Sequence, residues 1–509
     1  MGEFDPMSAV VSLDAAVSKF LDAGSTGRGA SLEPVGSPAF SAFGTYLHET
    51  VHWWQHIGTT AGLLYGLSIP VQTLATTLYL SESRTSVSKP LTDAISRSHA
   101  SDHPAVLAVS RWSEIELAVG LLYSPSNANA RLEANPRFYE SLGHSLLLAQ
   151  ISTVAGLART LDPQFLGLPN AAEWIPYYED FVKSQRQYFV PDQLMQLPLG
   201  MREIMEGQAR FAELQYRSLG YRDARRQAWL GGVYTVAFDE YLKIAGLPVP
   251  DGFDDASVNL FLLLCDIALN PSSGYPDPID PSRDFVHDLH PGIRFLRLCG
   301  EVKRDRTIVL EVEKVGYKSY VNASRRLCER LDWLDPVTVG QHCIARGAKM
   351  SGWAELQQQF EKCDFGPVDV PIRFYMGKHL EFLEIKIECP HFYCWPARFL
   401  TFSDDQSHAA APFQELLSWS MPPFLTSSLT TGVDATNLTF GTKAQRSKFV
   451  NTYFATLVLY DMVRQWISNR GEFRFDYKWK GRLSQTELES IWRQFEKSMG
   501  LSHTQLPIL

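Results

Sequence analysis

The feature that most restricts the fold of this chain is a long stretch without charged side chains. Residues 50–81 contain no Asp, Glu, Lys or Arg, and the part from residue 61 to residue 80 is long enough to cross a bilayer. The same stretch contains Gly62, Pro70 and Gln72, and no basic residues flank it. Because proline interrupts helices and membrane spans usually carry Lys or Arg at their ends, we expect a buried core helix that breaks near Pro70 and disfavour a membrane location.

The overall composition is that of an ordinary globular protein. Of the 509 residues, 45% are hydrophobic and 20% are charged, and this length predicts two or three packed domains. The formal net charge is -9 and no long basic segment is present, so a nucleic-acid partner is not expected. The composition leaves the oligomeric state open.

The cysteines and the N-terminus indicate a cytoplasmic location. Seven cysteines, an odd number, are scattered between Cys265 and Cys394, which does not suggest a disulfide framework. The N-terminus lacks the basic stretch and continuous apolar segment of a signal peptide. The six residues before Met7 resemble a vector-derived extension, and we therefore take the first domain to begin at Met7.

Hydrophobic periodicity predicts a mainly α-helical chain. Helices are expected at residues 41–57, 104–123, 136–160, 192–219, 222–245 and 256–270. Beyond residue 300, the segments 307–315, 370–387 and 473–479 are rich in β-branched and aromatic residues, which is typical of strands. We therefore predict a helical domain at residues 7–300, an α+β accessory region at 301–420 and a mostly helical region at 421–509.

A metal-binding motif lies inside the first of these helices. The sequence His48-Glu49-Thr50-Val51-His52 places two histidines one helical turn apart, on the same face. Two such imidazoles can bind one zinc ion, and the intervening glutamate can accept a proton from a water molecule that attacks a carbonyl. In a chain of this composition the pattern is expected by chance at most about 0.04 times, so we predict a zinc site with Glu49 as general base.

The third ligand distinguishes the classes of HExxH zinc enzyme. The metzincin pattern is absent, because Gln55 and Gly58 occupy the positions of its glycine and histidine. Farther along, the run Glu206-Gly207-Gln208-Ala209 resembles the second helix of the gluzincin metallopeptidases. This resemblance implies a zincin-like peptidase domain in which Glu206 completes the zinc site and a protein or peptide is the substrate.

Several alternatives for the ligand remain open at this point. Glu203 and Glu213 lie on the same predicted helix as Glu206, and either could take its place. His56 follows His52 by one further turn, although three ligands from consecutive turns of one straight helix diverge too far to bind a single ion. His56 is therefore expected to support the site or the core.

A third segment, His290-Pro291-Gly292-Ile293-Arg294, resembles the His-Pro-x-x-Arg segment of some membrane-linked zinc proteases. The resemblance implies that His290 or Arg294 stabilises the oxyanion of a tetrahedral intermediate. The competing interpretation is a helix N-terminus, capped by Asp288 and with Pro291 in its first turn.

Two other interpretations of the sequence stay open. Glu49-x-x-His52 also has the spacing of a di-iron carboxylate oxidase or oxygenase, although the only other such pair, Glu388-x-x-His391, contains a proline. A non-catalytic interaction scaffold could also keep the motif helix as structure. Cys389, His391 and Cys394 suggest a second zinc, but no matching second pair of ligands occurs at the usual spacing.

Overall fold

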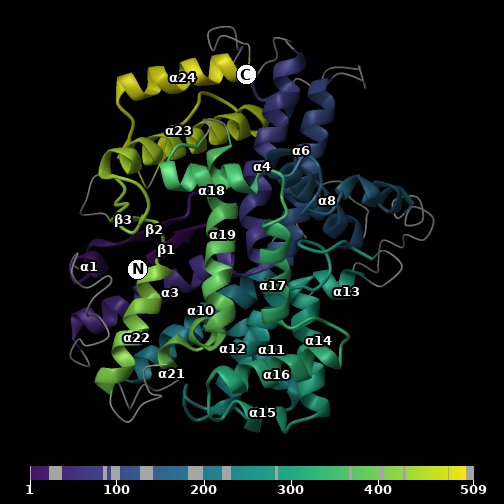
Figure 1. The fold of residues 1–509 in the computed structure, drawn as a ribbon, viewed down its shortest axis with the longest axis vertical. Coiled ribbons are helices and arrows are strands. Elements are labelled where there is room, and N and C mark those ends of the chain that lie inside the picture. Colours follow the sequence, from purple (N-terminus) through teal and green to yellow (C-terminus); the bar gives the residue numbers. More distant parts are fainter. Residues whose placement is uncertain are drawn as a thin grey trace.

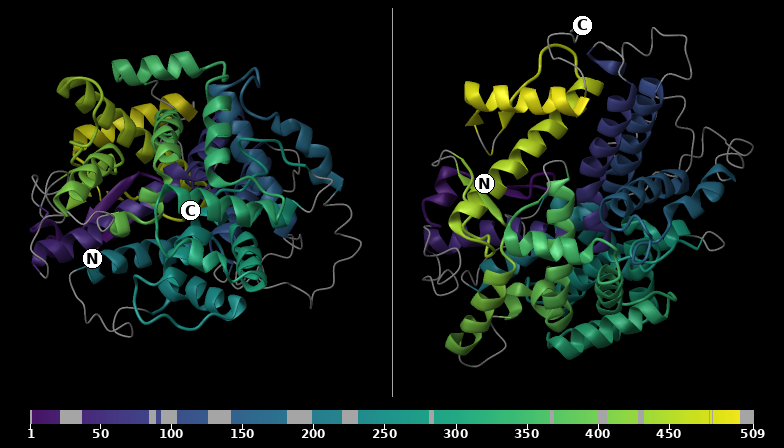
Figure 2. Two further views of the ribbon diagram at one scale, coloured as in Figure 1. Left: turned by 60° about the horizontal axis from the view of Figure 1, so that its bottom comes forward. Right: turned by 45° about the horizontal axis from the view of Figure 1, so that its top comes forward.

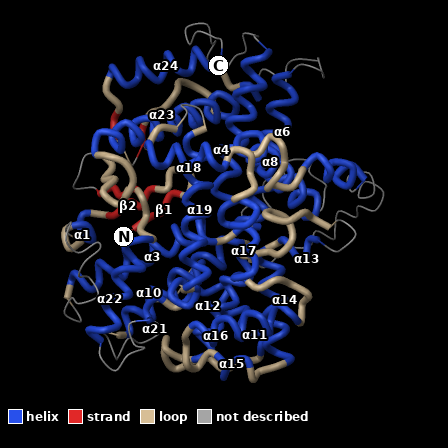
Figure 3. The backbone as a smooth tube through the Cα atoms, in the orientation of Figure 1, coloured by secondary structure: helices blue, strands red, loops and turns tan. Residues whose placement is uncertain are grey.

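The prediction of a mainly α-helical chain is confirmed (Figures 1 and 3). The computed structural model describes residues 2–21, 37–83, 89–92, 104–125, 142–180, 199–219, 231–280, 285–365, 369–399, 406–427, 432–477, 479 and 481–499. Parts of the helices predicted at 136–160, 192–219 and 222–245 lie outside these ranges. In the described part, no helix is both long and apolar enough to cross a membrane.

Helices make up most of the described part of the first 304 residues. They are α1 (Ala15–Ser18), α3 (Pro38–Gly58), α4 (Thr60–Ser83), α6 (Pro104–Tyr123), α8 (Leu142–Leu161), the 3-10 helix η2 (Ala171–Trp174), α10 (Met201–Ser218), α11 (Val233–Ala245), α12 (Ala256–Leu269), α13 (Phe285–Leu289) and α14 (Pro291–Arg304). The charge-free stretch forms the end of α3 and most of α4, and α4 continues through Pro70. The buried helix was thus predicted correctly, and its break near Pro70 was not.

Helices also fill the region in which an α+β fold was expected. They are α15 (Ile308–Glu311), α16 (Tyr317–Glu329), α17 (Pro336–Gly347), α18 (Trp353–Lys362), α19 (Val370–Glu388), α20 (Pro390–Cys394), α21 (Pro396–Phe399) and α22 (Gln406–Trp419). Helices α23 (Lys443–Ser468) and α24 (Gln485–Met499) follow in the region that was predicted to be mostly helical. The strand predictions at 307–315 and 370–387 are therefore wrong. Helix α19 is buried on nearly all sides, so its apolar residues follow no helical period and resemble a buried strand.

The strands form two small sheets. In the first, β2 (Val10–Leu13) pairs antiparallel with β1 (Gly2–Asp5) and parallel with β3 (Phe424–Ser427). This sheet pairs the N-terminal segment with residues 424–427, and residues 2–5, which lie before the predicted domain start, belong to it. In the second, β4 (Asp476–Tyr477) pairs antiparallel with β5 (Gly481–Arg482). Only β4 lies within the segment predicted as a strand at 473–479.

Helix α10 lies at the boundary of two hydrophobic core clusters. The larger cluster contains the buried residues of α3, α4, α19 and α23, and the other contains those of α11, α12, α14 and α16. Ala209 and Ala212 of α10 belong to the first cluster, whereas Ile204, Met205 and Phe211 belong to the second. The views in Figure 2 show the same body from two further directions, with α24 and α23 in contact at one end. Helix α10 therefore brings polar side chains to α3 on a rigid support.

Candidate metal centre

Helix α3 holds the two histidines of the motif in a fixed orientation. The helix begins after Ser37, whose side chain accepts a hydrogen bond from the backbone N–H of Phe40, and Pro38 occupies its first turn. One helical turn separates His48 from His52, and their Nε2 atoms lie 3.2 Å apart. The ring planes are inclined by 81°, so the two imidazole rings do not stack. Their Nε2 atoms instead face one common point.

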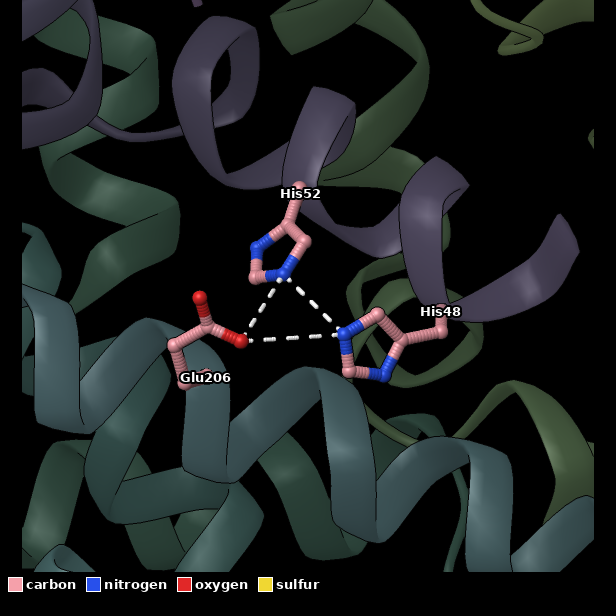
Figure 4. A group of neighbouring side chains, drawn as sticks. All are labelled: His48, His52 and Glu206. Carbon is pink, nitrogen blue, oxygen red and sulfur yellow. Dashed lines mark hydrogen bonds and ion pairs between the residues drawn. The ribbon is translucent and has the colours of Figure 1, made fainter. Parts of the chain in front are cut away.

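Glu206 of α10 completes a triangle with these nitrogens (Figure 4). Its Oε2 atom lies 3.7 Å from Nε2 of His48 and 3.5 Å from Nε2 of His52. Tetrahedral ligands at zinc distances lie roughly 3.3 Å from one another, so the triangle has the size that a metal ion requires. His48, His52 and Glu206 can hold a metal ion, and they are the residues that the sequence predicted as ligands.

The outer nitrogen of His52 is fixed by a glutamine from the same helix. Nδ1 of His52 lies 2.8 Å from Oε1 of Gln55. The amide nitrogen of Gln55 donates to the carbonyl oxygen of Met205 and to Oε1 of Gln208, both at 2.9 Å. Because Gln55 already donates twice through its nitrogen, its oxygen accepts from His52, and Nδ1 carries the proton. The lone pair of His52 then lies on Nε2, toward Glu206.

The outer nitrogen of His48 faces a carboxylate instead. Nδ1 of His48 lies 3.3 Å from Oε2 of Glu213, one of the residues considered as an alternative third ligand. Glu213 also binds Arg210 at 2.5 Å and Arg217 at 2.7 Å. Burial raises the pKa of Glu213, but His48 and the two arginines outweigh it and lower the pKa to about 2. Glu213 therefore stays charged and orients His48 from the side opposite the ligand triangle.

Without a metal, this arrangement favours a proton on His48. Burial lowers the pKa of His48, yet the carboxylates of Glu206 and Glu213 outweigh burial and raise it to about 9. The pKa of Glu206 lies well below its usual range, because the two histidines outweigh the opposing effect of burial. A metal ion that binds here must therefore displace a proton.

Glu203, the other alternative ligand, belongs to the end of α10. One of its carboxylate oxygens accepts a hydrogen bond of 2.7 Å from the backbone N–H of Gly200. This bond closes the first turn of α10, in the manner of a capping box. Glu203 thus stabilises the helix that carries Glu206.

Glu49 is buried beside the histidines and is not one of the three ligands. Only 5% of the residue is exposed, and burial raises the pKa of its carboxyl group, while His52 and His48 act in the opposite direction. A Cβ atom added to Gly2 would lie 2.7 Å from both Cγ and Oε1 of Glu49. The backbone of β1 therefore covers this carboxylate.

The contacts that the structure gives His290 and Arg294 lie at helix ends, and none of them is with His48, His52 or Glu206. His290 caps α14 by accepting from the N–H of Ile293, and burial lowers its pKa to about 4. Arg294 is fully buried, and its guanidinium group donates to the carbonyl oxygens of Ile267, Asn270 and Asp288 and packs 3.9 Å from the ring centroid of Trp333. These contacts support a helix N-terminus with Pro291 in its first turn, although its cap is His290 and not Asp288 as expected. The oxyanion role that the resemblance implies stays a prediction.

His56 lies outside the ligand triangle as well. Its Nδ1 atom is 3.2 Å from the carbonyl oxygen of Gly62, and its ring packs against those of Phe4 and Tyr65. Burial lowers its pKa to about 3. His56 is therefore a neutral core residue at the junction of α3 and α4.

Three polar neighbours of the site were not assigned to it from the sequence. Gln55 and Gln208 form the amide bridge described above, and the ring of Tyr234 lies 5.9 Å from that of His48. The guanidinium group of Arg210 covers the same tyrosine ring at 5.6 Å. Gln55 could have been assigned from the sequence, because it lies three residues after His52 and so on the same side of the helix. Nothing in the sequence distinguishes Tyr234 from other tyrosines.

The second possible zinc site, at Cys389, His391 and Cys394, is not among the groups of described residues that could hold a metal ion. Sγ of Cys389 lies 3.8 Å from His391, and Cys394 is almost completely buried. Pro390 begins a new helix between Glu388 and His391, so this Glu-x-x-His pair does not lie on one helix. Among the described residues, the group of His48, His52 and Glu206 is the only one whose ligand atoms converge.

Comparison of the chain with family models, curated proteins and solved structures gives no match.

Proposed function

We propose that this chain is a zinc-dependent hydrolase that cleaves peptide bonds. The observation that carries the proposal is the convergence of His48, His52 and Glu206 beside a buried carboxylate, Glu49. A site with two imidazoles and one carboxylate matches the donor set of catalytic zinc sites that leave one position open. Zinc bound there would supply a Lewis acid that polarises a carbonyl group and acidifies water.

The residues around the metal have separate roles in the proposed reaction. Glu49 accepts the proton of the attacking water, and its raised pKa makes it a stronger base than an exposed glutamate. Gln55 and Glu213 keep the two imidazoles in the orientation that points Nε2 at the metal. We also propose that the substrate is a protein or peptide and that the chain is cytoplasmic, as expected from the sequence.

Exchange of Glu49 for glutamine tests the proposal most directly. Glu49→Gln preserves shape but removes the proton acceptor, so we expect about one zinc per chain and a ~10²–10⁴-fold loss of hydrolysis. Zinc is measured by elemental analysis, and hydrolysis with a mixed library of quenched fluorescent peptides. Glu301→Gln is the control, because Glu301 is equally buried but pairs with Arg304.

The outcomes separate the competing functions. His48→Ala and His52→Ala should lose zinc, and undiminished zinc in both would contradict the ligand assignment. Two irons per chain would favour the di-iron oxidase, and no metal would favour the scaffold. Full zinc with unchanged turnover in Glu49→Gln would show that Glu49 is not the base.

A further inference from the structure

One row of side chains on α10 is partly exposed, and the metal ligand Glu206 lies in the middle of it. All of residues 201–216 are buried except Arg202, Glu206 and Arg210, which are half-buried. These three follow one another at intervals of four residues, so they lie on the same face of the helix. One arginine therefore lies one helical turn before the metal ligand, and the other lies one turn after it.

The two arginines differ in their partners. Arg210 binds Glu213 at 2.5 Å, and its guanidinium group covers the ring of Tyr234 at 5.6 Å. Arg202, in contrast, forms no hydrogen bond or ion pair with any residue that the structure describes. Arg202 therefore offers a positive charge to a ligand beside the metal centre.

Two tyrosines accompany Arg202. The rings of Tyr65 and Tyr123, from α4 and α6, stack with their centroids 4.4 Å apart. The end of α6 packs on the start of α10, since a Cβ atom on Gly200 would lie 2.7 Å from the carbonyl oxygen of Tyr123. Burial and the charge of Glu206 raise the pKa of Tyr123 to about 12, against the charge of Arg202. Tyr123 is thus close to both charged groups, and neither tyrosine hydroxyl bonds to a described residue.

We propose that Arg202, with the hydroxyl groups of Tyr65 and Tyr123, binds a carboxylate group of the substrate beside the metal centre. The inference rests on the proposed function, because carboxylates are the anions that an unmodified peptide carries. A guanidinium group presents a planar fork of donors that fits a carboxylate, and hydroxyl groups can donate to the same oxygens. Arg202 is also the second residue of α10, where the positive end of the helix dipole attracts an anion.

The position of Arg202 sets how far this carboxylate lies from the cleaved bond. One helical turn is about 5.4 Å long, and an extended peptide advances roughly 3.3 Å per residue. The carboxylate therefore belongs to a residue within about two positions of the cleaved bond. It is either the C-terminus of the peptide, which makes the chain an exopeptidase, or the side chain of an Asp or Glu.

The test compares three sets of N-acetylated peptides on the full-length zinc-loaded chain. The first set has a free C-terminus and no acidic residue, the second an amidated C-terminus and one Glu, and the third an amidated C-terminus with Gln in place of that Glu. Cleavage is measured as the release of amino groups. The variants are Arg202→Gln, Arg202→Lys and the control Arg111→Gln, which removes an exposed cation from α6 about 18 Å along the helix from Tyr123.

We expect the wild type and Arg111→Gln to cleave the first or the second set with a kcat/KM at least ~10-fold above that for the third. Arg202→Gln should keep its zinc and lose this preference, mainly through a higher KM. Arg202→Lys should restore part of the preference, because lysine returns the charge without the planar fork. A preference for the first set assigns the site to a peptide C-terminus, and one for the second set assigns it to an acidic side chain.

Equal cleavage of the three sets by the wild type, or an unchanged preference in Arg202→Gln, would contradict this inference alone. If no peptide is cleaved, binding decides between the two proposals. Fluorescein-labelled peptides of the three sets are then titrated with zinc-loaded Glu49→Gln, with and without Arg202→Gln, and followed by fluorescence anisotropy. Tighter binding of a carboxylate peptide that depends on Arg202 would support the carboxylate site and contradict the peptidase. Equal binding of all three sets would overturn the carboxylate site as well.

Discussion

At the residue scale, the outer nitrogens of the two histidine ligands contact different kinds of side chain. His52 donates its outer N–H to the neutral amide of Gln55, whereas His48 faces the charged carboxylate of Glu213. A carboxylate partner makes an imidazole a more basic ligand and fixes its tautomer. Glu213 therefore contributes to metal affinity without touching the metal.

We expect Glu213→Gln to weaken zinc binding by about 10–100-fold. The amide keeps the size of the side chain but loses the charge that orients His48. Glu206→Gln should weaken binding much more, since it replaces a direct ligand. Glu203→Gln is the matched control on the same helix and should change affinity only slightly. Competition with a chromophoric chelator measures all three, and an equal loss in Glu203→Gln and Glu213→Gln would show that helix stability, and not orientation of His48, controls affinity.

Zinc affinity should also depend on pH through His48. The pKa of His48 is raised to about 9 in the metal-free site, so below that pH the residue carries a proton that zinc must displace. We expect the apparent affinity to rise by about tenfold per pH unit between pH 7 and 9 and to level off above. Affinity that is constant over this range would mean that His48 is already neutral in the metal-free protein.

At the element scale, local signals predicted individual helices well. Residues 104–123 were predicted as a helix and form α6 with the same limits. Helix α19 was missed, because it is buried on nearly all sides and its apolar residues therefore follow no helical period. The ligands were found from spacing and resemblance. The pairing of His48 with Glu213 was not, since it depends on how α10 is rotated against α3.

The junction of α3 and α4 should be sensitive to a single methyl group. A Cβ atom on Gly62 would lie 2.1 Å from the carbonyl oxygen of Gln55, the residue that orients His52. We expect Gly62→Ala to reduce the free energy of unfolding by about 1–3 kcal/mol and to weaken zinc binding. Gly120→Ala in α6, where a Cβ atom meets nothing within 4 Å, should be neutral or stabilising by up to ~1 kcal/mol. Thermal and urea denaturation measure the difference, and equal stability of the two variants would contradict this packing.

At the scale of the whole molecule, a buried ion pair joins the two core clusters behind the metal centre. Lys386 of α19 donates to the carbonyl oxygen of Gly58, at the end of α3, and to the carboxylate of Asp266 of α12 at 2.7 Å. Tyr320 and Asn270 donate to the same carboxylate. The pair thus connects the ligand-bearing helix α3 with the helices that pack on the far side of α10.

Removal of Lys386 should therefore loosen the two clusters from each other. Lys386→Met leaves the charge of Asp266 buried without its cation, and we expect a loss of about 3–5 kcal/mol in the free energy of unfolding. Lys448→Met is the control, since Lys448 forms an exposed pair with Asp364 and should contribute less than about 1 kcal/mol. Adding Asp266→Asn to Lys386→Met should restore part of the loss, because the amide can still accept from Tyr320 without an unpaired charge.

Urea unfolding, followed by both tryptophan fluorescence and helical circular dichroism, measures these effects. If the pair joins the clusters, the two signals should separate in Lys386→Met. The contrary result is that the two signals of Lys386→Met change together and its free energy of unfolding equals that of Lys448→Met. Apolar packing across α10 would then be sufficient to hold the two core clusters together.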